Sequence, residues 1–245
     1  MLQTDRAALG STSIRYGVFD WLELSATVPY GYASRTTQIG PGKHATYIVG
    51  GLGDSQIQAN VRLVQQSRDW PGVVLSVGAI NPTGRNPYSF AGYTLDSSNA
   101  VATPNPTDVL RDYFTIGTWG IHSNLQFYKT IDPVILFAGG GVDYLFGDTV
   151  DSYYVRQGVR YTYNAGFSLA LSEKTTVGFS INGVYQGNLS VNGRVVVDSN
   201  EELILARLSV IQRVAKNVFV EPSVSFGLNA DSPDVQFDVG LRAQF

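Results

Sequence analysis

The sequence predicts an all-β fold, a transmembrane antiparallel up-and-down β-barrel of about 12 strands. Three observations lead to this prediction. Apolar and polar residues alternate with a period of two in many runs, which is the pattern of a strand with two different faces. Charged residues make up 15% of the chain, where roughly 25% is usual for a soluble domain. Short and long connections alternate between the runs, as they do in bacterial outer-membrane barrels.

The polarity of the second face of each run separates a membrane barrel from a soluble one. In residues 161–171 tyrosine, phenylalanine and leucine share one face, whereas threonine, asparagine, glycine and serine dominate the other. The polar face of a soluble sandwich meets bulk water and would be rich in lysine and glutamate. Small polar residues with an isolated charge per strand instead favour a water-lined interior and an aromatic-rich face toward lipid. A soluble sandwich or lipocalin-like barrel is the less favoured alternative.

The periodic runs predict eleven strands. In chain order they cover residues 11–19, 22–36, 52–64, 73–84, 113–128, 134–146, 159–171, 175–187, 201–213, 218–229 and 235–245. The expected short connections are 20–21, 65–72, 129–133, 172–174 and 214–217; the longer ones are 37–51, 85–112, 147–158 and 188–200, with a tight last turn at 230–234. This alternation fits short periplasmic turns and longer outer loops.

An even number of strands is usual in single-chain bacterial barrels, so a twelfth strand is expected. It comes either from residues 1–10 or from a segment upstream of Met1. Residues 1–6 lack the apolar core of a signal peptide, so a signal peptide and a further periplasmic region are expected upstream. Residues 1–245 are expected to form a single outer-membrane β-barrel domain.

Charged residues on the polar face are the candidate site. These lumen-lining candidates are Arg15, Glu23, Asp54, Arg62, Asp143, Arg160, Arg207, Arg213, Glu221, Asp238 and Arg242. An arginine or lysine facing lipid at mid-bilayer would cost about 2–4 kcal/mol, which places these charges inside. They form either a mutually neutralising ladder that holds the barrel round or a constriction that selects polar or ionic cargo. The mixture of signs argues against strong ion selectivity.

Two further segments invite interpretation. Gly139-Gly140-Gly141 marks either a bend at a barrel corner or the close approach of another segment, such as a docked plug. The loop at 85–112 is long enough to be functional or disordered. Four of its apolar residues would let it fold over the mouth of the barrel; they are Tyr88, Phe90, Tyr93 and Leu95.

An enzyme is not expected. The two histidines are His44, in a loop, and His122, on a strand. His122 and Ser123 would point to opposite faces of that strand, so they could not act as base and nucleophile. No metal site or cofactor is expected, and a formal charge of −3 disfavours a nucleic-acid partner. The absence of cysteine is compatible with an oxidising compartment without indicating one.

The end of the chain and three internal segments together suggest a family. The last strand alternates and ends in Phe245, which resembles the signal recognised by the barrel-assembly machinery. Residues 16–30 read YGVFDWLELSATVPY, and Gly51-Leu52-Gly53-Asp54 and Pro82-Thr83-Gly84 follow. This series resembles the outer-membrane barrels associated with phenol degradation (MetA-type) and, most closely, the related channel that secretes functional-amyloid (Fap) subunits. The resemblance is specific over residues 16–84 and looser to the end of the chain.

The resemblance implies a channel in the outer membrane of a Gram-negative bacterium, with outer-membrane lipid as a partner and a homotrimer as a candidate assembly. One expectation is export of unfolded amyloid subunits through a polar lumen. The other is uptake of small aromatic or hydrophobic molecules, which would suit inward-facing Ile135, Phe137 and Leu145. The motif residues shape turns and strand ends, and they do not decide between these cargoes.

Overall fold

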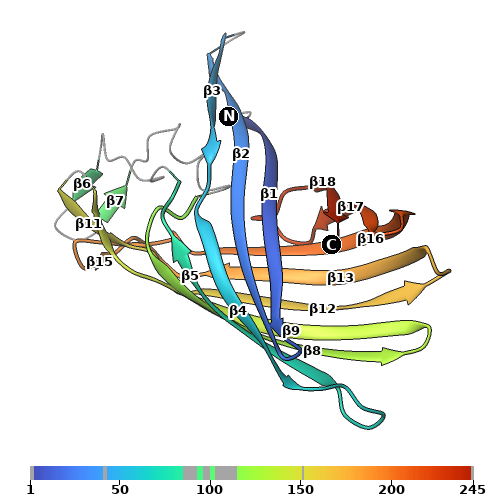
Figure 1. The fold of residues 1–245 in the computed structure, drawn as a ribbon. Coiled ribbons are helices and arrows are strands. Elements are labelled where there is room, and N and C mark those ends of the chain that lie inside the picture. Colours follow the sequence, from blue (N-terminus) through green and yellow to red (C-terminus); the bar gives the residue numbers. More distant parts are fainter. Residues whose placement is uncertain are drawn as a thin grey trace.

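The protein is one long antiparallel sheet with two small sheets beside it (Figure 1). The structure, a computed structural model, describes residues 3–40, 43–84, 93–95, 100–102, 115–150 and 152–243. In these ranges no helix is long and apolar enough to cross a membrane.

Eleven strands follow one another through the main sheet in chain order. They are β1 (Gln3–Phe19), β2 (Leu22–Gly40), β4 (Ser55–Val64), β5 (Gly72–Asn81), β8 (Gly120–Ile131), β9 (Val134–Leu145), β12 (Arg160–Ala170), β13 (Thr175–Gln186), β16 (Glu201–Ala215), β17 (Val218–Gly227) and β18 (Val235–Ala243). Each pairs antiparallel with the next. The all-β antiparallel prediction and its eleven strands are confirmed.

The connections between these strands divide the sheet into two ends. Short connections join β1 to β2, β8 to β9, β12 to β13 and β16 to β17, with a somewhat longer one between β4 and β5. They define the short-turn end. The connections at the opposite end, between β5 and β8 above all, are longer, and they define the long-loop end. The alternation predicted from the sequence is therefore present.

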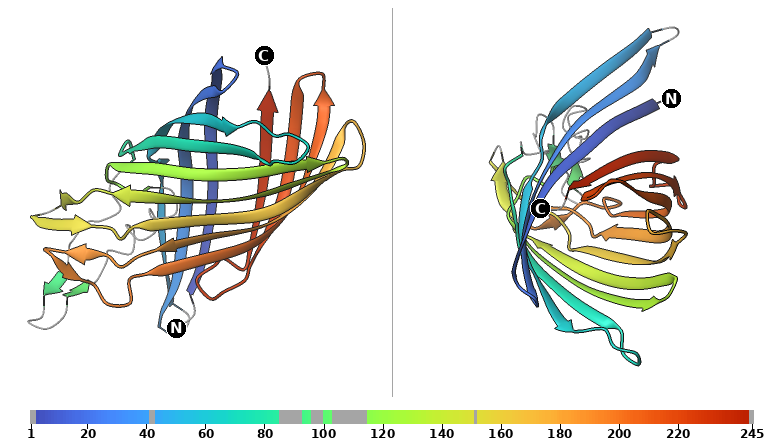
Figure 2. Two further views of the ribbon diagram at one scale, coloured as in Figure 1. Left: turned by 90° about the horizontal axis from the view of Figure 1, so that it is seen from below. Right: turned by 45° about the vertical axis from the view of Figure 1, so that its right-hand side comes forward.

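The sheet curls strongly but stays open between its first and last strands. Figures 1 and 2 show the first strands, in blue, and the last strands, in red, brought toward the same side of the molecule. No ladder joins β1 to β18 within the described ranges. Residues 3–10 continue β1 instead of forming a separate strand, so the expectation that residues 1–10 supply the twelfth strand is wrong. Closure by an upstream strand stays a prediction.

All four of the longer expected loops contain strands that the sequence pattern does not predict. The loop expected at 37–51 is largely a ladder, because β2 continues to Gly40 and β3 (Lys43–Leu52) folds back along it. The β-branched residues of β3 suit an extended strand. The three-stranded ribbon β1–β2–β3 projects beyond the other strands (Figure 1). In the next loop, β6 (Tyr93–Leu95) pairs with β7 (Ala100–Ala102).

The connections at 147–158 and 188–200 meet in a second small sheet. It contains β10 (Asp148–Val150), β11 (Tyr153–Arg156), β14 (Ser190–Val191) and β15 (Arg194–Val195), in that order. Asn192 and Gly193 turn β14 into β15 with φ of 50° and 79°, as an Asn-Gly hairpin turn requires. Asn192 also bonds both backbone groups of Tyr154, at 2.7 and 2.8 Å. This dipeptide was a signal for the hairpin in the sequence.

The ladders assign every strand residue to one of two faces, because cross-strand partners lie on the same side of a sheet. One row of partners, taken strand by strand, is Gly17, Glu23, Asn60, Ser76, Asn124, Gly141 and Thr162. We call the side that carries this row the polar face and the other side the apolar face.

Burial of the two faces is the reverse of that in a soluble protein. On the apolar face Ile57 is 57% exposed, whereas Ser25 and Asp143 on the polar face are each 6% exposed. Aromatic and aliphatic side chains are thus presented outward, and polar side chains are enclosed by the curl of the sheet. Such an outer surface suits a hydrocarbon environment rather than water.

Cysteine labelling of β18 tests this assignment, and the chain has no native cysteine. In lipid vesicles we expect Asp238→Cys and Arg242→Cys to react with a water-soluble maleimide, and Phe237→Cys and Val239→Cys to be protected. Asn164→Cys and Tyr163→Cys give the same comparison on β12. Inverted reactivity on either strand would mean that its register is shifted by one residue, since one step exchanges the faces.

Candidate functional site

The polar face carries ten of the eleven predicted lumen-lining residues. The ladders place Arg15, Glu23, Arg62, Asp143, Arg160, Arg207, Arg213, Glu221, Asp238 and Arg242 on that face. Asp54 lies between β3 and β4 and is described separately below. The ten residues do not form one cluster; they are spread over eight strands in several groups.

A charged row crosses five adjacent strands near the long-loop end. Its consecutive cross-strand partners are His122, Asp143, Arg160, Gln186 and Glu201. His122 Nδ1 lies 2.5 Å from Asp143 Oδ1, and the Arg160 guanidinium donates to Gln186 Oε1 at 2.9 Å from Nη2. Opposite charges are neighbours at Asp143 and Arg160, and the neutral amide of Gln186 separates Arg160 from Glu201.

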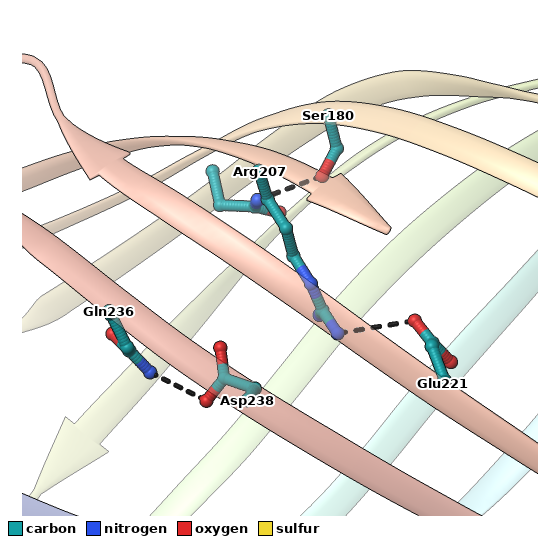
Figure 3. Close-up of polar contacts among 6 residues, drawn as sticks. Ser180, Arg207, Glu221, Gln236 and Asp238 are labelled. Carbon is teal, nitrogen blue, oxygen red and sulfur yellow. Dashed lines mark hydrogen bonds and ion pairs between the residues drawn. The ribbon is translucent and has the colours of Figure 1, made fainter. Parts of the chain in front are cut away.

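A second group lies on β16–β18, where one polar pair joins β16 to β17 and a second pair lies within β18 (Figure 3). Arg207 Nη2 donates to Glu221 Oε1 at 3.1 Å, and Gln236 Nε2 donates to Asp238 Oδ1 at 2.9 Å. Small serines surround Arg207: Ser180, Ser209, Ser223 and Ser225. Among the described residues, the Nε of Arg207 and the Oγ of Ser223 are buried without a hydrogen-bond partner.

Two smaller groups complete the face. Asn60 donates to Glu23 Oε1 at 3.0 Å and accepts from the Ser76 hydroxyl at 2.7 Å. Glu23, Asn60 and Arg62 line a cavity of about 410 Å³ at the short-turn end. At the same end of β17 and β18, the Arg242 guanidinium lies 5.2 Å from the centre of the Phe219 ring, a cation–π distance.

Asp54 is a buried junction residue, only 3% exposed. Its Oδ1 accepts the Gly84 N–H at 2.9 Å, and its Oδ2 accepts the Gly117 N–H at 2.6 Å and the Ile116 N–H. The sequence pattern predicts Asp54 as one more lumen charge and gives no sign of this role. Backbone N–H groups thus supply the hydrogen bonds of the buried carboxylate, and such bonds are stronger when the acceptor is ionised.

The three motif segments quoted from the sequence meet at this junction. Gly53 N donates to Pro29 O at 2.8 Å. Thr83 Oγ1 donates to Gly53 O at 2.9 Å and accepts the Ser55 N–H at 2.8 Å. The sequence did contain a signal for this junction. Pro29, Gly53-Asp54 and Pro82-Thr83-Gly84 each stand at the same end of neighbouring strands, so their spacing brings them together.

The glycine run on β9 does not interrupt the sheet. The ladders of β9 with β8 and with β12 continue through Gly139, Gly140 and Gly141 without a register shift. A Cβ on Gly139 would collide with the Gln126 side chain, and one on Gly141 would lie 2.9 Å from Asn124 Nδ2. The space above both polar-face glycines is therefore filled by amide side chains of β8.

Some predicted features fall outside the described residues. They are Phe245, the side chain of His44, and the side chains of Tyr88, Phe90, Tyr93 and Leu95. The placement of the His122-Ser123 pair was predicted correctly. His122 lies on the polar face and contacts Asp143, and Ser123 pairs with Val142 on the apolar face.

The curled antiparallel sheet, polar on the enclosed face and apolar on the exposed one, has the fold of an outer-membrane β-barrel protein. The structure resembles the crystal structure of an outer membrane channel from Pseudomonas putida F1, with a TM-score of 0.69 at 14% sequence identity. The match covers 98% of this chain and 83% of that one. No protein-family model matches the sequence.

A pair of alanine substitutions tests the close packing of the polar face. A Cβ at Gly166 would collide with the backbone oxygen of Phe179, whereas one at Gly17 would meet no atom within 4 Å. We expect Gly166→Ala to lower the free energy of unfolding by about 1–3 kcal/mol, as overpacking does. Gly17→Ala is the matched control, and we expect it to change the same quantity by less than about 1 kcal/mol. Urea unfolding from lipid vesicles measures both; equal effects would contradict the packing described.

Proposed function

We propose that this protein is a passive channel in the outer membrane of a Gram-negative bacterium. The observation that carries the proposal is the reversed burial of the two faces over eleven paired strands. Lipid offers no hydrogen bonds, so a spanning sheet must pair its backbone groups internally and direct its apolar side chains outward. The likeness to the fold of the Pseudomonas putida outer membrane channel supports the proposal.

For the cargo, we propose an extended, polar polypeptide, in the manner of the amyloid-subunit secretion channel that residues 16–84 resemble. Serine, asparagine and glutamine side chains are distributed over the polar face, and Asn124, Gln126 and Gln236 among them are partly exposed. A chain in transit can form brief hydrogen bonds with such groups. Because each bond is weak, the cargo is released again, as conduction requires.

Uptake of small aromatic or hydrophobic molecules is the second candidate, favoured by apolar residues on the polar face. The ladders place Ile135 and Phe137 there, with Phe137 opposite Tyr128 of β8. This group lies toward the short-turn end. Leu145 also belongs to that face but is 1% exposed and packed against Ile116, so it offers no surface to a cargo.

Current through planar bilayers tests the channel and its charge balance. Besides the six predicted arginines, the polar face carries the carboxylates of Glu23, Asp143, Glu221, Asp238 and Glu201, so we expect a small reversal potential under a salt gradient and weak preference between cations and anions. A pure-lipid bilayer is the control. A reversal potential close to that of a perfectly selective pore would contradict the neutralised face, and a lack of current would contradict the channel.

Deletion of the gene separates the two cargoes. If polypeptide export is correct, the deletion strain loses extracellular amyloid fibres and grows normally on aromatic carbon sources. A plasmid copy of the intact gene should restore the fibres. Normal fibres with slowed growth on aromatics would contradict export and support uptake.

A further inference from the structure

Residues 115–118 form a buried segment that belongs to no strand. The sequence analysis placed them in a strand beginning at residue 113, but β8 begins only at Gly120. Thr115, Ile116, Gly117 and Thr118 are all buried, and Thr115 and Thr118 are each 3% exposed. Such enclosure is unexpected for a connection at the end of a sheet, since connections usually lie on the surface.

The segment lies on the polar face. Ile116 packs against Ile80 of β5 and Leu145 of β9, which are 0% and 1% exposed. The ladders place Ile80 opposite Gly120 and Gly120 opposite Leu145, in a row that shares its face with Asp143. Gly120 leaves room for this packing, because a Cβ there would lie 2.8 Å from Leu145 Cδ2. Residues 115–118 therefore lie on the polar face of β5 and β9, beside the first residue of β8, and the chain enters β8 from there.

Side chains from two separate parts of the sheet hold the segment in place. Asp54, just before β4, accepts the N–H groups of Ile116 and Gly117. Gln157, just before β12 and 5% exposed, donates from Nε2 to Ile116 O at 2.7 Å. β5, β8 and β9 lie between β4 and β12 in the sheet. Gly117 has φ of 76°, a conformation that favours glycine and bends the segment toward Asp54.

Gln157 also connects the segment to the charged row. Its Oε1 accepts from Gln186 Nε2 at 2.9 Å, and Gln186 Oε1 accepts from Arg160. Residues 115–118 therefore occupy the polar side of the sheet at the long-loop end, joined to Arg160 through two glutamines. The segment is fixed at both backbone groups of Ile116, which makes it rigid compared with a loop bonded only to water.

We propose that residues 115–118 form a fixed constriction at the long-loop end of the channel, and that Asp54 and Gln157 are the positioning residues that hold it. The proposal rests on the channel function proposed above. A carboxylate is suited to the Asp54 position because it only accepts hydrogen bonds and can accept several at once. An asparagine has one accepting oxygen, so it cannot accept from Gly84 and from the Ile116 and Gly117 N–H groups at the same time, and the junction that holds the segment is weakened.

The test combines Asp54→Asn with a reporter cysteine in place of Thr118. Among the described residues the Thr118 hydroxyl has no hydrogen-bond partner, so Thr118→Cys removes none of the bonds described. We expect this cysteine to be protected from a water-soluble maleimide in the otherwise unchanged protein. In the Asp54→Asn background we expect it to react roughly tenfold faster or more, since loss of buried hydrogen bonds promotes local opening. Single-channel conductance should rise roughly twofold as the constriction is released.

Two further variants complete the design. Asp231→Asn is the matched control, because the Asp231 carboxylate accepts a backbone N–H from Glu202 at the same end of the sheet without touching residues 115–118; it should change neither readout. Gln157→Leu releases the segment from its other side, and it decides the question if Asp54→Asn does not fold.

The outcomes separate the constriction from the channel. Faster labelling together with higher conductance supports the proposal. Unchanged labelling in both variants would show that Asp54 and Gln157 do not position the segment, and faster labelling with unchanged conductance would show that the segment is not the constriction; either result overturns the proposal. If even the unchanged protein passes no current, the channel function fails and the constriction with it, while labelling still decides whether Asp54 holds the segment.

Discussion

The unbroken antiparallel ladder from β1 to β18 is the constraint on which the rest of the structure depends. Because every strand bonds to its neighbours in a fixed register, a side chain's position along the strand decides its face. Ten separate charged residues, from Arg15 to Arg242, thereby reach the same side. A single shifted strand would place its charges among the exposed apolar residues, where lipid would not tolerate them.

On the polar face, side chains are matched in size as well as in polarity. Glycines such as Gly139 and Gly166 stand where the long side chains of Gln126 and Phe137 on the neighbouring strands need space. Ion pairs supply part of the bonding between side chains on this face. The Arg207–Glu221 pair is about one-third exposed on each side chain, so its contribution to stability is small. Amides and hydroxyls, as in the Asn60 group, supply most of the other bonds described on this face.

The sequence predicted the eleven strands and their faces because both follow from a local period of two, which each strand repeats on its own. It predicted the small outer sheets poorly, since two-residue strands such as β14 and β15 are too short to show a period. Asn192-Gly193 marked their turn all the same. The segment at 115–118 could not be predicted, because its position depends on Asp54 and Gln157, which are 62 and 41 residues from Ile116 in the chain. Asp54 was assigned to the lumen for the same reason: its partners are backbone groups that no sequence pattern marks.

The sheet of β10, β11, β14 and β15 has a consequence for how the long-loop end can vary between related sequences. It is assembled from the β9–β12 and β13–β16 connections, and β11 pairs directly with β14. Here neither connection can be exchanged alone without removing the other's hydrogen-bonding partner. The two must diversify as a pair, so grafted epitopes and natural variants should be accommodated more readily when both are changed together.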